Sequence, residues 1–136
     1  MNPLTTSAPR WFVVDDESMI SSLVEQVLRR FSIADVRACA DPCDALDQMT
    51  AAPADIELLV TDLNMPGMSG IELARRIRTL APRAKILLTT GRALAMPDER
   101  TLRSYGVDLF LPKPFGVQEL MSAVRKLCGE GSLRSV

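Results

Sequence analysis

The sequence alternates, five times over, between a short apolar run and a longer segment whose apolar residues recur at helical spacing. Each run is too short for a helix, and the first, at residues 11–14, is apolar on both faces, which is typical of a parallel strand covered by helices on both sides. Strands that alternate with helices form a parallel sheet with helices on both faces. We therefore predict an α/β fold, a doubly wound five-stranded parallel sheet.

The apolar patterns also give the element boundaries. Strands are predicted at residues 11–14, 35–39, 56–60, 85–89 and 109–111. The first helix is predicted from apolar residues at helical spacing, which are Met19, Ile20, Leu23, Val24, Val27, Leu28 and Phe31. The inner face of the third helix is predicted to consist of Ile71, Ala74, Ile77 and Leu80. Because Pro112 lacks a backbone donor, the last strand is expected at an edge of the sheet.

Helix ends carry further signals. Asp41, followed by a proline, predicts the start of the second helix. Ser69 and Glu72 have the three-residue spacing of a capping box before the third helix. A short fourth helix is predicted at about 97–104, with Gly106 behind it as its end.

The length of 136 residues predicts one domain, at about residues 10–128. A flexible leader at 1–9 and a loose tail at 129–136 are expected around it, because both are rich in proline or polar residues. The chain has no histidine, and its three cysteines match no disulfide or zinc spacing. Without a signal peptide or a long apolar run, the domain is expected in the cytoplasm.

Charge excludes two classes of partner. With 16 Lys and Arg against 17 Asp and Glu, the net charge of -1 gives no reason to expect direct nucleic-acid binding or membrane binding. Arg75, Arg76 and Arg78 are interpreted as a solvated helix face.

Reactive side chains follow four of the five predicted strands. Asp15 and Asp16 follow the first, Asp62 the third, Thr90 the fourth and Lys113 the fifth. Right-handed crossovers bring the carboxyl ends of parallel strands to one edge of the sheet, so these residues are predicted to converge there. Each close pair of carboxylates would repel by roughly 4 kcal/mol at an effective dielectric constant of 20. The cluster therefore needs a cation.

Oxygen ligands without histidine or thiolate favour a hard ion, and an open site that keeps water suits Mg²⁺. Such a site would offset the charge of an incoming phosphoryl group, while Lys113 and the Thr90 hydroxyl hold its oxygens. One carboxylate would then be the nucleophile, because an aspartate can form an acyl phosphate.

Four motifs together resemble the receiver domain of two-component response regulators, with a chemotaxis-regulator-like pattern. They are Asp15-Asp16, the segment Asp-Leu-Asn-Met-Pro-Gly-Met-Ser-Gly at 62–70, Thr90-Gly91 and Lys113-Pro114-Phe115. The resemblance covers about residues 10–128. It implies the flavodoxin-like strand order 2-1-3-4-5, which the apolar pattern alone does not give.

The resemblance also implies roles. Asp62 would accept a phosphoryl group from a sensor histidine kinase or a histidine phosphotransfer protein. Mg²⁺ would be bound by Asp16, Asp62 and the backbone carbonyl of Asn64, with Asp15 acting through water. The output would be a contact with a downstream protein that the sequence does not identify. The resemblance also allows a homodimer on activation.

Further roles concern the switch. Thr90 and Phe110 would be the switch pair, and the Lys113-Pro114 bond would be cis. Arg92 places a long cation near the mouth of the site, where it would affect dephosphorylation. Gly116 occupies the usual capping position of the last helix, where Asp or Ser would stabilise more.

Two alternatives remain open. A constitutive pseudo-receiver would keep the fold without accepting phosphate, although such proteins usually lose the acidic or lysine positions that this chain keeps. A Mg²⁺-dependent phosphatase with an aspartyl-phosphate intermediate is disfavoured because Asn64 stands where an acid or base would be needed. The chain is therefore expected to promote only its own phosphorylation and dephosphorylation.

Overall fold

Five parallel strands form one sheet in the order β2-β1-β3-β4-β5, which confirms the predicted fold. The computed structural model describes residues 8–91 and 97–134. The strands are β1 (Arg10–Val14), β2 (Asp35–Cys39), β3 (Ile56–Asp62), β4 (Lys85–Thr90) and β5 (Leu109–Pro112). The helices are α1 (Ser18–Phe31), α2 (Pro42–Ala51), α3 (Gly70–Leu80), α4 (Glu99–Ser104) and α5 (Val117–Cys128). As Pro112 predicted, β5 lies at an edge of the sheet.

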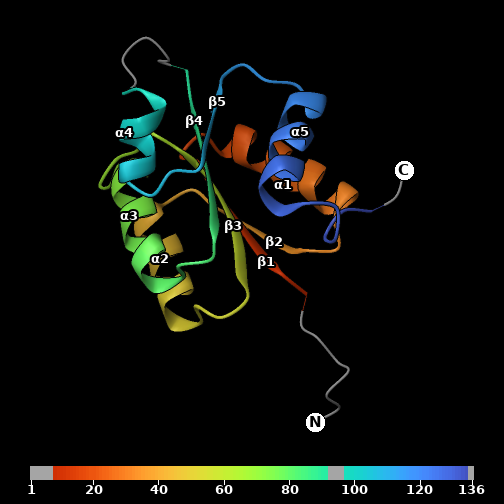
Figure 1. The fold of residues 1–136 in the computed structure, drawn as a ribbon, viewed down its shortest axis with the longest axis horizontal. Coiled ribbons are helices and arrows are strands. Elements are labelled where there is room, and N and C mark those ends of the chain that lie inside the picture. Colours follow the sequence, from red (N-terminus) through yellow and green to blue (C-terminus); the bar gives the residue numbers. More distant parts are fainter. Residues whose placement is uncertain (1–7, 92–96, 135–136) are drawn as a thin grey trace.

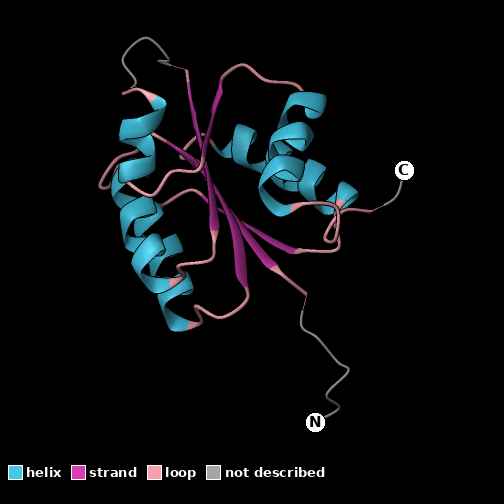
Figure 2. Ribbon diagram, in the orientation of Figure 1, coloured by secondary structure: helices cyan, strands magenta, loops and turns pink. Residues whose placement is uncertain are grey.

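The sheet lies between two layers of helices. Figure 1 shows α2, α3 and α4 on one face and α1 and α5 on the other, and Figure 2 shows the strands between them. Side chains of β1 alternate between the two faces, with Phe12 in one apolar core and Trp11 in the other, and both are fully buried. Burial on both faces explains the apolar run of β1, whereas β2 at an edge of the sheet keeps Asp35 and Arg37 exposed. In the two described ranges, no helix is long and apolar enough to cross a membrane.

Helix α1 buries fewer apolar side chains than its pattern predicts. Met19 is 86% exposed and Leu23 is 62% exposed, whereas Val24 and Leu28 are buried. Ser21 is buried as well, and its hydroxyl donates to the carbonyl of Ser18 (3.1 Å). The apolar spacing that predicted this helix thus includes two side chains that do not face the core, because a helix packed on a sheet buries only one stripe.

Helix ends largely follow the predicted caps. The Asp41 carboxylate accepts from the backbone of Cys43 (2.9 Å), and the Ser69 hydroxyl accepts from the backbone of Glu72 (3.2 Å). At the start of α5, the backbone of Gly116 donates to the Glu119 carboxylate (3.0 Å), which compensates in part for the missing side-chain cap.

Arg78 is not a solvated residue, contrary to the sequence-based interpretation. One guanidinium nitrogen donates to the carbonyls of Pro82 (2.9 Å) and Ala84 (2.7 Å). The other donates to the carbonyl of Gly106 (2.8 Å) and to the carboxylate of Asp108 (2.6 Å). This side chain therefore ties the end of α3 to the turn between α4 and β5.

The C-terminal tail is not loose as far as Arg134. The backbone of Arg134 donates to the carbonyl of Phe31 (2.9 Å), and Leu133 forms an antiparallel bridge with Ser32. The Ser132 hydroxyl donates to the Glu57 carboxylate (2.9 Å). Polar residues were expected to stay solvated, but backbone pairing and a half-buried leucine hold this segment against α1.

Candidate functional site

Four strand ends meet at the carboxyl edge of the sheet, as predicted. Asp15 follows β1, Asp62 ends β3, Thr90 ends β4 and Lys113 follows β5. Asp15 is 4% exposed, Asp62 is 7% exposed and Thr90 is fully buried. Each of these side chains is held at the end of a buried strand and is therefore largely shielded from solvent.

Lys113 is the cation at the centre of the cluster. Its ammonium lies 2.8 Å from a carboxylate oxygen of Asp15 and 3.4 Å from one of Asp62. A third carboxylate, that of Glu17, lies 4.0 Å away. The Lys113 side chain is only 13% exposed, so these contacts are poorly screened by solvent.

Burial and the ion pairs shift the pKa values of both Asp62 and Lys113. Burial raises the pKa of the Asp62 carboxyl above its ordinary value of 3.8; Lys113 opposes this rise, and Asp15 adds to it. Burial alone would lower the pKa of the Lys113 ammonium, but Asp15 and Asp62 outweigh it, and the pKa lies above 10.5. The lysine is therefore charged at neutral pH, and ionised Asp62 is held at a cost in stability.

The backbone next to Asp62 is held by β4 and by the start of α3. Leu63 donates to the carbonyl of Thr89 (2.9 Å), and Gly70 donates to the carbonyl of Leu63 (2.8 Å). A β-carbon added at Gly70 would overlap the carbonyl oxygen of Asp62 and lie 2.9 Å from the Leu88 side chain. Only glycine allows this close approach.

Three carboxylates can reach one ion. Oxygen atoms of Asp15, Asp16 and Asp62 lie within 4.8 Å of one another, and Asp16 is exposed while the other two are buried. An all-oxygen set with one side open to water fits Mg²⁺. Asn64, predicted to add its backbone carbonyl, lies exposed two residues beyond Asp62.

The predicted switch residues lie on neighbouring strands. The Thr90 carbonyl accepts from the backbone of Lys113 (2.8 Å), which couples the end of β4 to the lysine. Phe110 is half-buried and lies opposite Leu88 in the sheet, two residues before Pro112, which is the register partner of Thr90.

Other expectations had mixed outcomes. The Lys113-Pro114 bond is cis, as the resemblance implied. Arg92 lies outside the described residues.

Sequence reasoning gave no role to Glu17, whose backbone donates to the Asp15 carboxylate (2.9 Å) and whose side chain approaches Lys113. Its position directly after the acidic pair was the signal.

We expect Asp62→Asn to raise the Tm of the Mg²⁺-free protein at pH 7 by about 3 °C. The folded pKa of Asp62 is raised, so its contribution to stability is complete below about 3.8 and is lost as pH rises through the folded pKa. The gain of the variant should therefore shrink as pH falls toward 4. Thermal unfolding at several pH values checks this, and a variant less stable than wild type at pH 7 would contradict it.

Comparison with known proteins agrees with this geometry. The family model described as "Response regulator receiver domain" matches residues 12–125. A chemotaxis protein CheY homolog of Campylobacter jejuni is 32% identical over 123 residues, 88% of this chain and 92% of that protein. Response regulator MprA of Mycobacterium avium is 32% identical over 118 residues, 87% of this chain but only 50% of MprA.

Solved structures show the same fold. A CheY-like response regulator receiver domain protein from Methanospirillum hungatei superimposes with a TM-score of 0.79 at 24% identity, over 91% of this chain and 96% of that one. At this identity the likeness concerns the fold alone. The sequence match across nearly the whole sheet, however, is independent of it, and on that ground the chain belongs to the response regulator receiver domain family.

Proposed function

We propose that the chain accepts a phosphoryl group on Asp62 from the phosphohistidine of a sensor histidine kinase or a histidine phosphotransfer protein. The observation that carries this proposal is the buried cluster in which Lys113 contacts both Asp15 (2.8 Å) and Asp62 (3.4 Å). Because these 136 residues contain no histidine, a phosphohistidine donor must lie outside them.

In the proposed transfer, an Asp62 carboxylate oxygen attacks phosphorus. The phosphorus–nitrogen bond breaks, its electron pair returns to the imidazole, and an acyl phosphate forms on Asp62. Lys113 would leave its contact with Asp62 to hold a phosphoryl oxygen, and the Thr90 hydroxyl would hold another. Mg²⁺ bound by Asp15, Asp16, Asp62 and the Asn64 carbonyl would offset the charge that the phosphoryl group brings.

The acyl phosphate would shift the domain between two conformations and would not be an intermediate in the catalytic turnover of a substrate. A change from 1:99 to 99:1 between two conformations requires about 5.5 kcal/mol of differential stabilisation. New contacts of the phosphoryl group with Lys113 and Thr90 would supply it, and Phe110 on the adjacent strand would carry the change to the surface. The output would be a contact with a downstream protein in the cytoplasm.

Incubation with Mg²⁺ and phosphoramidate, followed by intact-mass measurement, tests the proposal. We expect one phosphoryl adduct on the wild type, no adduct on Asp62→Asn, and no adduct when the metal is chelated. Asp55→Asn is the matched control, since Asp55 is an exposed aspartate at the opposite edge of the sheet.

Two outcomes would overturn the proposal. No adduct within seconds on folded protein would favour a constitutive pseudo-receiver. Release of free phosphate over many turnovers would favour a phosphatase.

A further inference from the structure

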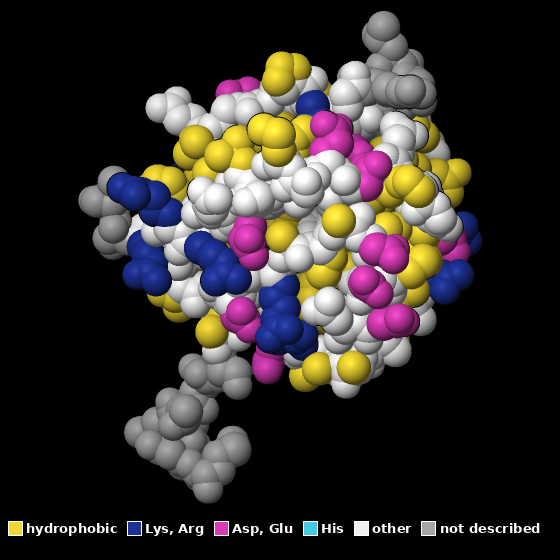
Figure 3. All heavy atoms as spheres, turned by 180° about the vertical axis from the view of Figure 1, so that it is seen from behind, with side chains coloured by type: hydrophobic (Ala, Val, Ile, Leu, Met, Phe, Trp, Pro, Cys, Tyr) yellow, Lys and Arg dark blue, Asp and Glu magenta, His cyan; other side chains and the backbone are white. Residues whose placement is uncertain are grey.

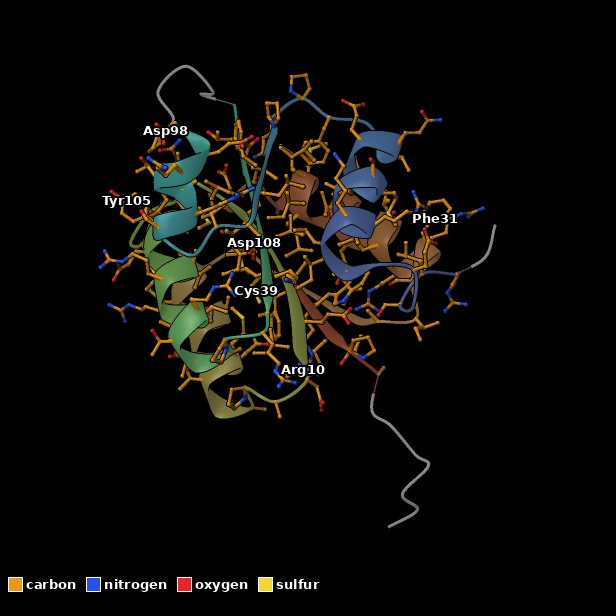
Figure 4. All side chains as sticks on the ribbon, viewed as in Figure 1. Arg10, Phe31, Cys39, Asp98, Tyr105 and Asp108 are labelled. Carbon is orange, nitrogen blue, oxygen red and sulfur yellow. The ribbon has the colours of Figure 1, made fainter. Side chains whose placement is uncertain are left out.

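A surface groove with three arginines in its lining lies away from the proposed phosphoacceptor site, between α3 and the turn from α4 to β5. It has a volume of about 300 Å³, and its lining residues are Arg75, Arg78, Arg103, Ser104, Tyr105 and Gly106. Figure 4 shows Tyr105 at the outer side of the molecule beside α4, with Asp108 farther in toward the sheet. We call this the α3–α4 groove.

The three arginines of the groove differ in how many hydrogen bonds and ion pairs their guanidinium groups already make. All the contacts of Arg78 go to the protein, since its guanidinium bonds Asp108 and backbone carbonyls. Arg75 has only a long ion pair with Glu72 (3.8 Å) between two exposed side chains. The exposed Arg103 guanidinium has no hydrogen-bond or ion-pair partner among residues 8–91 and 97–134.

Arg103 lies near the end of α4, and hydrogen bonds hold the turn that follows on its inner side. Arg78 holds the Gly106 carbonyl (2.8 Å), and the Asp108 carboxylate also accepts from the backbone of Ile86 (2.8 Å). Gly106 has a positive φ of 91°, which lets α4 end sharply there. Two arginine side chains with free donors are thus presented from fixed backbone, which lowers the entropic cost of binding an anion.

Acidic residues limit the size of that anion. Glu72 lies one turn before Arg75 on α3, and Glu99 lies one turn before Arg103 on α4. A long polyanion crossing the groove would meet both carboxylates. A short acidic stretch, one or two carboxylates long, would meet only the arginines and the face of the half-buried Tyr105.

We propose that the α3–α4 groove binds a short acidic peptide segment of a partner protein, with carboxylates paired to Arg75 and Arg103. The planar guanidinium group can bind a carboxylate with two parallel hydrogen bonds, which makes arginine well suited to this ligand. The site does not use Asp62, so this inference is independent of the proposed phosphoryl transfer.

Nucleic acid fits the surface less well. The net charge is -1, and the face seen in Figure 3 carries both signs of charge, with Asp and Glu side chains gathered on its right half. Sequence-independent binding to a phosphate backbone needs an extended basic stripe.

Fluorescence anisotropy with a labelled peptide of alternating Asp and Glu, ten residues long, tests the proposal at low salt. The variant Arg75→Glu/Arg103→Glu should bind at least about tenfold more weakly than wild type, because two charge-assisted pairs are lost. Arg76→Glu/Arg100→Glu is the matched control: it changes net charge equally, on the same two helices, at residues that do not line the groove. It should weaken binding less than about threefold.

The same titration on Asp62→Asn should give the wild-type affinity, which separates this inference from the phosphoacceptor role. Equal weakening by both pairs of substitutions would overturn the proposal, because binding would then be diffuse. So would no binding by the wild type, or displacement of the peptide by a single-stranded DNA of equal length at lower concentration. Arg75→Gln/Arg103→Gln, which adds no repulsion next to Glu72, repeats the test if the charge reversal fails to fold.

Discussion

Lys113→Met is expected to lower the free energy of unfolding by about 3 kcal/mol in Mg²⁺-free buffer at pH 7, because it leaves buried carboxylates without their cation. Asp15 and Asp62 are both less than 10% exposed, and the lysine ammonium lies 2.8 and 3.4 Å from them. Adduct formation with phosphoramidate should also fall. Urea unfolding followed by circular dichroism measures the loss of stability.

The cause of that loss can be separated from lost packing. If repulsion between carboxylates dominates, the double variant Lys113→Met/Asp62→Asn should recover most of the stability, and the coupling between the two changes should exceed about 1 kcal/mol. Mg²⁺ should also stabilise the Lys113→Met protein, by about 2.7 kcal/mol at a concentration of 100 times Kd. A Lys113→Met protein as stable as wild type without Mg²⁺ would contradict the assignment.

Gly70→Ala is expected to destabilise the fold by about 3 kcal/mol, at the upper end of the cost of overpacking. The new β-carbon would overlap the Asp62 carbonyl, which is backbone and cannot rotate away, and would press on Leu88. The carbonyl belongs to Asp62, the proposed phosphoacceptor, so the adduct yield on Asp62 should fall as well. Thermal unfolding and intact mass measure the two effects.

Gly131→Ala is the control for that substitution. A β-carbon at Gly131 meets no atom within 4 Å, so the Tm should change by less than about 2 °C. If the two alanine variants were equally stable, the close approach of α3 to Asp62 would not be a constraint on this fold.

The predicted order of elements was correct because local signals agreed with one another. Apolar runs gave each strand to within about two residues, and the side chains after the runs converged because parallel strands share an edge. Asp41 and Ser69 cap their helices through contacts of two and three residues in sequence. Such contacts can be predicted from spacing alone.

The contacts that were missed are of longer range. Arg78 bonds Asp108, 30 residues away, and Ser132 bonds Glu57, 75 residues away, so neither pairing leaves a periodic pattern. Met19 and Leu23 continue the apolar spacing of α1 but stay exposed, because spacing does not say how much of a helix its neighbours cover. Long-range polar contacts therefore had to come from the structure.

The two ends of the described chain have a practical consequence for labelling. The carbonyl of Pro9 accepts from the backbone of Asp35, and Arg134 pairs with Phe31 and Ser32, so both ends are tied to the turn between α1 and β2. That turn lies at the amino edge of the sheet, whereas Asp62 lies at the carboxyl edge. A dye or surface tether attached next to either described end would start from the amino edge of the sheet, opposite the edge that holds Asp62.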